Sequence, residues 1–305
     1  MAARLSSHYV KTADGGQLAV AIQNTAQQKQ AALFIHDFMT DNRLFHPLFG
    51  QPNLPPLQLV AHDLRGFGKS ADPTGPYSPL EDIDTVLASL SIEQVHVVGA
   101  GFGGAIAMEY AISRRHRTIS VAVLGSGLPG HCWREKHYFD ISKARFAGRM
   151  RSIGAKYVLG DENSLDTTYW KQKFITSNET WSSPLTSGDK LVAKRLLSMA
   201  KAYQGYHFFQ ADPVVPQLTD IEPLCNRLGD VCVPVLVAVG KNDTQDFLEI
   251  AEEIALGVGT TPMYVDNARH FVMLEQPFAV ANLLNEFWMD VQRRHVNLEI
   301  NGTRH

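Results

Sequence analysis

The chain has 305 residues, of which 45% are hydrophobic and 19% are charged. This length and composition fit an ordinary globular protein with a sizeable core, built as one large α/β domain with an insertion. The net charge of −3 and the even spread of Lys and Arg give no basis for binding nucleic acid or an anionic membrane. A small-molecule substrate is therefore expected.

The sequence carries no targeting or anchoring signal that we recognise. Residues 1–16 lack the apolar segment of a secretory signal, and no apolar run approaches the roughly 20 residues of a membrane span. Cys132, Cys225 and Cys232 do not have the spacing of metal ligands. These features predict a cytoplasmic protein without a metal or cofactor, and they leave the oligomeric state open, a homodimer included.

Seven short runs rich in apolar and β-branched residues predict β-strands. Most of these runs are continuously apolar, as strands buried on both faces are. Helical patterns lie between several of them, which predicts an α/β fold with a mostly parallel sheet and helices on both faces. The expected strands cover residues 17–23, 32–36, 57–62, 94–98, 120–124, 234–239 and 262–265.

Three segments in the core show clear helical patterns. The segment 78–90 begins with a capping box, in which Ser78 is the N-cap and Glu81 follows three residues later. The segments 247–256 and 278–292 have apolar residues at helical spacing. Each helix is expected to cover one face of the sheet.

The alternation of strands and helices stops between residues 128 and 215. This stretch is basic, aromatic and helical in pattern, and it predicts a lid inserted between core segments 1–127 and 216–305. Ligands of open α/β sheets bind beyond the carboxyl ends of the strands, so such a lid would shape an apolar pocket. A hydrophobic, aromatic or polyketide-like substrate of secondary metabolism follows from its composition. The aromatic side chains and one histidine of interest are Trp133, Tyr138, Phe139, Trp170, Trp181, Tyr203, Tyr206, His207, Phe208 and Phe209.

A glycine-rich turn links an expected strand to an expected helix within residues 97–111. It contains Gly99, Gly101, Gly103 and Gly104. A sharp turn of this kind needs small residues because the strand and the helix approach closely. Gly101 stands at the apex, where many hydrolases carry a nucleophilic serine. We expect the missing side chain to relax the turn and to leave a small space at the apex.

Four stretches, taken together, resemble the α/β-hydrolase fold family. They occur in the order of that family, and the resemblance covers about residues 17–292. The stretches are FIHDF (34–38), HDLRGFGKS (62–70), GAGFGG (99–104) and VGKND (239–243), the last followed by NARHFVMLEQP (267–277).

The resemblance implies roles for five residues. Asp243 matches the acid and His270 the base of the family's catalytic site, and a buried carboxylate in this pair fixes the imidazole tautomer. Gly101 occupies the nucleophile position, so a serine acyl-enzyme cannot form there. The backbone N–H groups of Phe38 and Phe102 are the candidate donors to an oxyanion.

One further departure concerns the segment after the third core strand, where the family's His-Gly is His36-Asp37. We interpret Asp37 first as a turn or cap carboxylate. If it points into the pocket, it repels an oxyanion unless it is protonated, and it suits proton transfer better than acyl transfer. Both residues are candidate binding residues. Thr40, Ser126 and Cys132 are disfavoured as replacement nucleophiles because none lies on the strand-to-helix turn.

These features support three hypotheses. In the first, the protein is an enzyme that acts on a small, largely apolar carbonyl compound by non-covalent general acid/base chemistry, as a lyase, isomerase, cyclase or water-activating enzyme, with His270 as the base. In the second, it is an ester, thioester or lactone hydrolase whose serine has been replaced by Gly101. In the third, it binds a ligand without catalysis. Survival of both Asp243 and His270 argues against the third.

Overall fold

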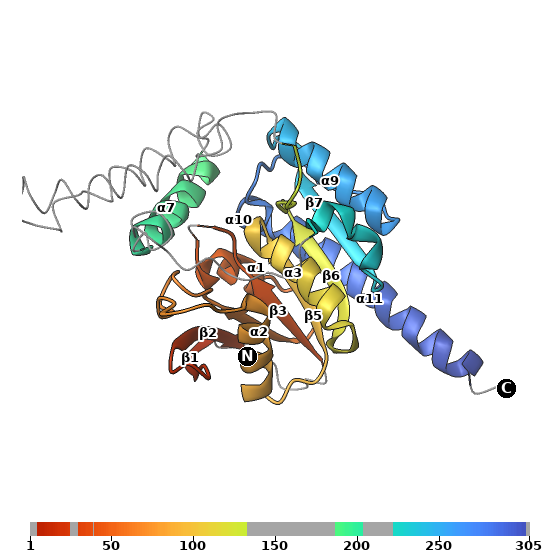
Figure 1. Cartoon of the computed structure of the whole chain (residues 1–305). Helices are drawn as coiled ribbons and strands as arrows, with labels where there is room; N and C mark the ends of the chain where they lie inside the picture. Colours follow the sequence, from red (N-terminus) through yellow and green to blue (C-terminus); the bar gives the residue numbers. More distant parts are fainter. Residues whose placement is uncertain (1–4, 25–29, 39, 133–186, 204–221, 303–305) are drawn as a thin grey trace, which may run out of the picture.

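An eight-stranded sheet forms the centre of the computed structural model, which describes residues 5–24, 30–38, 40–132, 187–203 and 222–302 (Figure 1). The strand order is β1-β2-β4-β3-β5-β6-β7-β8. The β1–β2 and β2–β4 pairs are antiparallel, and all the others are parallel. The strands are β1 Leu5–Lys11, β2 Gln17–Gln23, β3 Ala31–Ile35, β4 Gln58–His62, β5 Val95–Ala100, β6 Thr118–Leu124, β7 Val235–Gly240 and β8 Met263–Val265.

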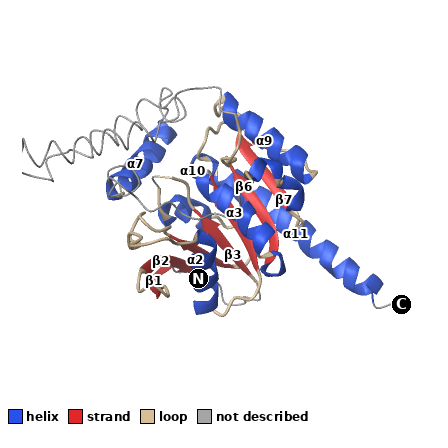
Figure 2. Cartoon of the chain, viewed as in Figure 1, coloured by secondary structure: helices blue, strands red, loops and turns tan. Residues whose placement is uncertain are grey.

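Helices cover both faces of this sheet (Figure 2). One face packs against α2, α3 and α9, and the other packs against η1, α1, α10 and α11. The α-helices are α1 His46–Phe49, α2 Pro79–Ser89, α3 Phe102–Ser113, α7 Ser187–Ala202, α9 Gln245–Val258, α10 Val272–Glu275 and α11 Pro277–Gly302. The short 3-10 helices are η1 Asn42–Phe45, η2 Arg115–Arg117, η5 Leu224–Asn226 and η6 Leu228–Asp230.

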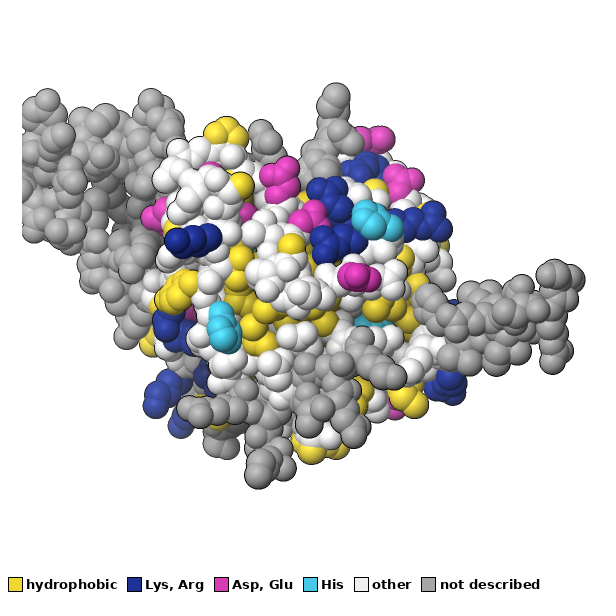
Figure 3. Space-filling model, turned by 90° about the horizontal axis from the view of Figure 1, so that it is seen from below, with side chains coloured by type: hydrophobic (Ala, Val, Ile, Leu, Met, Phe, Trp, Pro, Cys, Tyr) yellow, Lys and Arg dark blue, Asp and Glu magenta, His cyan; other side chains and the backbone are white. Residues whose placement is uncertain are grey.

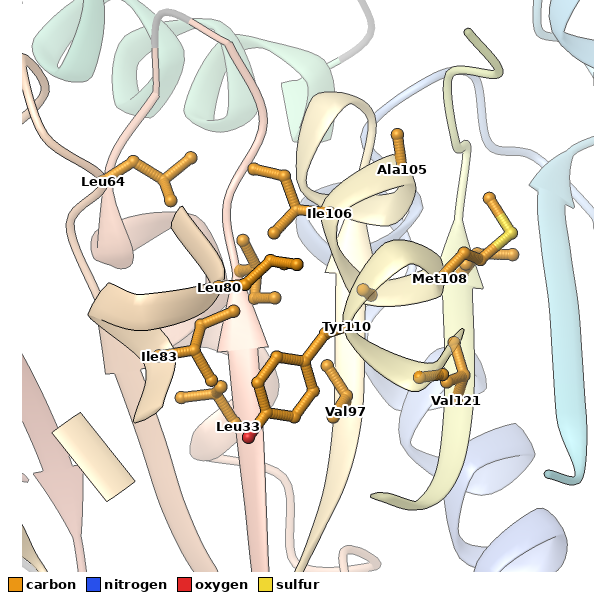
Figure 4. Packing of buried hydrophobic residues seen from close by; sticks show 14 of the residues in the cluster. Leu33, Leu64, Leu80, Ile83, Val97, Ala105, Ile106, Met108, Tyr110 and Val121 are labelled. Atoms are coloured by element: carbon orange, nitrogen blue, oxygen red, sulfur yellow. The ribbon is translucent and has the colours of Figure 1, made fainter. Parts of the chain in front are cut away.

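The two hydrophobic cores follow from the alternation of side chains along the central strands. Leu33 of β3 points into the core beneath α2 and α3, whereas its neighbour Phe34 points into the core on the opposite face. Figure 4 shows the first of these cores, in which Ile83 of α2 and Tyr110 of α3 lie over Leu33 and Val97. Burial on both faces explains why these strands are continuously apolar in sequence.

All seven expected strands are present, and the structure adds one that the sequence analysis missed. Strand β1 lies at the edge of the sheet, and most of its residues are exposed or half-buried. Its sequence is polar because only one side of it is paired and little of it is covered. Helix α2 begins where the capping pattern predicts, but the Ser78 side chain makes no capping hydrogen bond.

The described part of the expected lid is small. Helix α7 lies between β6 and β7 in the chain and packs against η1 and α10, which follow strands β3 and β8. It therefore lies near the carboxyl edge of the sheet, as Figure 1 shows. Tyr203, at its end, is buried and stacks on Phe67 with ring centroids 5.0 Å apart. The other aromatic residues singled out in this segment lie outside the described residues.

Two global features bear on function class. Within the described residues, no helix combines the length and the apolar character needed to cross a membrane. On the face seen in Figure 3, Lys and Arg side chains are interspersed with Asp and Glu. That face therefore carries no extended field of one sign.

Candidate active site

The strand-to-helix turn retains its strained geometry although its apex has no side chain. Gly101 has φ +51° and ψ −117°, in a region that favours glycine. A Cβ on Gly103 would lie 2.2 Å from the Ile35 carbonyl oxygen, and one on Gly99 would lie 2.2 Å from the Gly103 carbonyl oxygen. Glycine is thus required at both flanking positions. The expected relaxation of the turn has not occurred.

The space at the apex is filled by the carboxylate of Asp37, from the loop that follows the neighbouring strand β3. A Cβ on Gly101 would lie 2.0 Å from Cγ of Asp37. The register of the sheet explains this contact, because Ile35 of β3 pairs with Gly99 of β5, and Asp37 and Gly101 each follow two residues later in the chain, beyond the ends of the two strands. The expectation of an open space was wrong.

The backbone donors that the resemblance assigned to an oxyanion hold this carboxylate instead. Oδ1 of Asp37 accepts hydrogen bonds from the N–H groups of Phe38 and Phe102, each at 2.7 Å. Phe102 is the first residue of α3, so Asp37 also caps the positive end of that helix. The interpretation of Asp37 as a cap carboxylate is confirmed, but the same side chain also points into the site.

His270 joins two carboxylates. Its Nδ1 lies 3.1 Å from Oδ2 of Asp243, and its Nε2 lies 3.1 Å from Oδ2 of Asp37. The side chains of Asp243 and His270 are 0% and 5% exposed, whereas that of Asp37 is 11% exposed. Asp37 is therefore the most exposed side chain of the three.

The two carboxylates determine the protonation of the imidazole. Burial alone would lower the pKa of His270, but the charges and hydrogen bonds of Asp243 and Asp37 outweigh it and raise the pKa to about 10. At neutral pH the ring is an imidazolium that donates from both nitrogens. The role of His270 as a base stays a prediction, and it requires that the imidazolium first release a proton.

Aromatic rings and one glycine hold the imidazole in place. The ring of Phe247 lies 4.1 Å from that of His270, and the ring of Phe271 lies 5.0 Å from it, measured between centroids. A Cβ on Gly125 would lie 2.9 Å from the His270 carbonyl oxygen. The sequence analysis did not find these three residues, because an aromatic residue beside a histidine has no distinctive pattern.

His36 is buried behind Asp37 and does not line the site. It is fully buried, and its Nε2 accepts a hydrogen bond from the Leu64 N–H at 2.9 Å. Its Nδ1 therefore carries the hydrogen and donates to the carbonyl oxygen of Asp37 at 2.7 Å. The expected place of His36 among the binding residues is thus replaced by a positioning role under Asp37.

The three alternative nucleophiles are not at the apex. The hydroxyl of Thr40 donates to the Asp37 carbonyl oxygen at 2.7 Å, and that of Ser126 donates to the Gly127 carbonyl oxygen at 2.8 Å. Cys132 is exposed. The structure therefore offers no hydroxyl or thiol among them in place of the missing serine.

Away from this site, one group among the described residues brings possible metal ligands together. His131, Asp246 and Glu249 have ligand atoms within 4.8 Å of one another. Nδ1 of His131 already pairs with Glu253 at 2.8 Å. These ion-pair contacts account for the group as a link between the loop after β6 and helix α9.

Comparison with known proteins agrees with this architecture. Residues 32–283 match the family model described as the Alpha/beta hydrolase family, and the chain belongs to this family. In this member of the family, the carboxylate of Asp37, in the loop after β3, lies at the position that corresponds to the nucleophile, next to the Asp243–His270 pair.

Individual relatives are distant but cover most of the chain. The AB hydrolase superfamily protein YisY of Bacillus subtilis is 21% identical, over 92% of this chain and 98% of that protein. A putative 2-succinyl-6-hydroxy-2,4-cyclohexadiene-1-carboxylate synthase of the same organism is 23% identical, over 91% and 97%. The solved esterase of Exiguobacterium antarcticum is similar in fold, with a TM-score of 0.70 and 17% identity, over 92% of this chain and 99% of that chain.

Proposed function

We propose that this protein is an enzyme that acts on a small, largely apolar carbonyl compound by acid/base chemistry and without serine acyl transfer. The observation that carries the proposal is the placement of the Asp37 carboxylate at the nucleophile position, in contact with His270. In this proposal Asp37 accepts a proton, His270 donates one, and Asp243 orients the imidazole.

The proposed proton path follows from the charges of the three groups. Asp37, as the most exposed of them, takes a proton from the substrate or from a bound water molecule. Neutralising Asp37 removes one of the two charges that hold the proton on His270, so the imidazolium then gives up its proton more readily. The imidazolium can thus protonate the atom on which negative charge develops. A positioned acid or base contributes about 10²–10⁴-fold to the rate.

The hypothesis of a hydrolase that has simply lost its serine is less well supported. A side chain at residue 101 would overlap the carboxylate of Asp37, since the Cβ position lies 2.0 Å from its Cγ and from its Oδ1. A serine there requires Asp37 to adopt another position. Gly101 and Asp37 therefore form a matched pair, which favours chemistry built around the carboxylate.

The hypothesis of a pure binding protein is also less well supported. A ligand-binding site has no need of an imidazole held between two carboxylates, because burying three ionised groups costs desolvation energy even when they are paired. The presence of a relative named as a putative synthase indicates that names other than hydrolase occur among the similar proteins. This agrees with a proposal of non-hydrolytic or water-activating chemistry.

The test is a panel of small apolar ketones, β-diketones and lactones, incubated with the protein in deuterated water and analysed by mass spectrometry. We expect product formation or deuterium incorporation for the wild type. Asp37→Asn and His270→Gln should each reduce the rate by about 10²–10⁴-fold, the range of a lost acid or base. Cys132→Ser changes an exposed side chain outside the site and is the matched control. A rate that survives both active-site substitutions contradicts the proposal.

A further inference from the structure

We propose that Arg43 is a positioning residue, which fixes helix α7 so that the ring of Tyr203 stays against Phe38. Phe38 follows Asp37 directly in the chain, and its N–H donates to that carboxylate. The inference rests on the proposed function, because Phe38 then forms part of the wall that receives the apolar part of the substrate. It adds a residue that influences substrate binding without touching the reacting groups.

Helix α7 contacts elements from both halves of the candidate site. It packs against η1 and α10, which follow Asp37 and His270 in the chain. Its inner face is buried through Leu196, Met199 and Ala200. Apolar burial holds the helix on the core, but it is non-directional. A directional contact therefore adds precision to the position of α7.

Arg43 supplies a directional contact of this kind. The buried carboxylate of Asp41 holds its guanidinium through two hydrogen bonds, from Nε to Oδ1 at 2.8 Å and from Nη2 to Oδ2 at 2.6 Å. Such a bidentate pair fixes the plane of the guanidinium. The same group reaches α7, since Nη1 donates to Oγ of Ser198 at 3.1 Å and Nη2 donates to the Ser198 carbonyl oxygen at 3.4 Å. Arg43 thus ties α7 to η1.

The path from Ser198 to the aromatic wall is short. The N–H of Tyr203 donates to the Met199 carbonyl oxygen at 3.0 Å, so the helical hydrogen bonding of α7 continues to Tyr203. Tyr203 is buried, stacks on Phe67, and lies 6.2 Å from Phe38 between ring centroids. A shift of α7 therefore moves the ring of Tyr203 relative to Phe38.

The ring of Phe38 belongs to the apolar surface beside the proposed proton acceptor. Phe38 and Phe102 are half-buried, and their rings meet at 89° with centroids 6.3 Å apart. Both residues donate their N–H groups to Asp37. Small-molecule sites are mostly lined by side chains of this kind, and ring pairs prefer edge-to-face or offset geometries. A displaced Tyr203 would therefore change the shape of the wall that a substrate meets.

The exposure of the Arg43–Ser198 contact separates positioning from global stability. The side chain of Arg43 is 41% exposed, and Ser198 is exposed. Contacts between exposed groups contribute little to the free energy of unfolding. Among the described residues, the side-chain hydrogen bonds of Arg43 go to Asp41 and Ser198 and not to the three acid/base groups. Loss of the contact with Ser198 should therefore weaken substrate binding and leave the chemical step unchanged.

The experiment uses the full chain labelled with 3-fluorotyrosine, and it follows the fluorine NMR signal of residue 203, assigned with Tyr203→Phe. Heptan-2-one is the probe, and exchange of its α-hydrogens for deuterium gives KM and kcat. Arg43→Lys keeps a positive charge beside Asp41 but loses the fork that also reaches Ser198. We expect the residue-203 signal to shift or broaden and KM to rise about threefold to tenfold, with kcat within about twofold of the wild type. Titration of the same signal with heptan-2-one gives a dissociation constant that is independent of turnover and should rise by the same factor.

Variants of Ser198 and a matched arginine are the controls. Ser198→Ala should change KM in the same direction by a smaller factor, because the carbonyl acceptor remains, whereas Ser198→Thr keeps the hydroxyl and should match the wild type. Adding Ser198→Ala to Arg43→Lys should have no further effect, since both remove the same contact. Arg115→Lys changes an exposed arginine of η2, at the amino end of β6 and away from the site, and should leave every value unchanged. Urea denaturation verifies that the variants are folded.

The outcomes separate this inference from the proposed function. An unchanged fluorine signal in Arg43→Lys overturns the positioning role, and so does a fall in kcat at unchanged KM. Fully additive effects of Arg43→Lys and Ser198→Ala overturn it as well, because the two residues would then act independently. If exchange of heptan-2-one is indifferent to Asp37→Asn, the proposed function fails, whereas the fluorine signal still decides whether Arg43 positions Tyr203.

Discussion

The two halves of the site differ in how they were assembled. Asp243 and His270 lie in the loops that follow β7 and β8, at 3.1 Å from each other, as the resemblance to the family implied. In the other half, the turn after β5 is preserved, but Gly101 has no side chain and the carboxylate of Asp37, from the loop after β3, lies at that position. The place in the fold that corresponds to the nucleophile therefore holds a polar side chain, although residue 101 itself has none.

This difference also has an electrostatic consequence. A serine beside His270 would be neutral and would leave the imidazole with one carboxylate partner. Asp37 supplies a second negative charge at 3.1 Å, so the resting imidazole holds a proton. The pKa of His270, in the conventional half, is therefore raised partly by Asp37, which belongs to the changed half.

The largest effect is expected when the changed half is converted to the conventional arrangement. The double substitution Asp37→Gly and Gly101→Ser removes the carboxylate, frees the N–H groups of Phe38 and Phe102, and places a hydroxyl near His270. We expect the rate of 4-nitrophenyl acetate hydrolysis to rise by about 10²-fold or more, the contribution of an oxyanion donor. A serine-directed fluorophosphonate probe should label this variant and should not label residue 101 of the wild type.

The single substitutions are the controls for this conversion. Gly101→Ser alone should gain no esterase activity, because its Cβ would lie 2.0 Å from Cγ of Asp37. Adding His270→Gln to the double variant should abolish the gain. Equal activity in the single and double variants would show that Asp37 does not occupy the nucleophile position.

The fold was largely predictable because the central strands are buried on both faces and read as continuous apolar runs. The missed strand, β1, lies at the edge of the sheet and has exposed polar residues. Its pairing with β2 depends on a contact between segments, for which its own sequence has no periodic apolar signal. Edge strands of this kind are recognisable only after the neighbouring strand has been placed.

The site was predictable where a role depends on local sequence and unpredictable where it depends on register. Asp243 and His270 each follow a recognisable strand. The contact of Asp37 with the apex depends on Ile35 pairing with Gly99, a relation between two strands that local sequence does not encode. Aspartate is also common in turns and caps, so its type alone could not distinguish the roles. Here one carboxylate fills both.

A second substitution tests how tightly the strand-to-helix turn after β5 is packed. Gly103→Ala should destabilise the protein by about 3 kcal/mol, since its Cβ would lie 2.2 Å from the backbone oxygen of Ile35 and cannot be relieved by a side-chain movement. Urea denaturation measures the change. The matched control is Gly75→Ala, where no atom lies within 4 Å of the new Cβ and the expected change is within about 0.5 kcal/mol.

A third experiment measures the charge difference between the two halves directly. Asp37→Asn retains the size of the side chain and an oxygen that can accept from Phe38 and Phe102, but it removes one charge beside His270. Proton binding by His270 should weaken at least about tenfold, because an opposite charge within 4–6 Å shifts a pKa by about 1–3. Titration of the imidazole signals by NMR gives the value. An unchanged titration would mean that Asp37 and His270 are not in contact.

The smallest effect is the dependence of stability on pH. The pKa of His270 is raised to about 10 in the folded protein, against about 6.5 in an unfolded chain. The native state therefore binds the proton more tightly, so the stabilisation is complete below about pH 6.5 and is lost as the pH rises through about 10. The slope from this group is at most about 1.4 kcal/mol per pH unit. Urea denaturation at pH 8, 9 and 10 should show falling stability in the wild type and a shallower fall in Asp37→Asn. Because Lys and Tyr titrate identically in both proteins, the difference between the two slopes isolates the second carboxylate, and equal slopes would leave Asp243 as the sole electrostatic partner of His270.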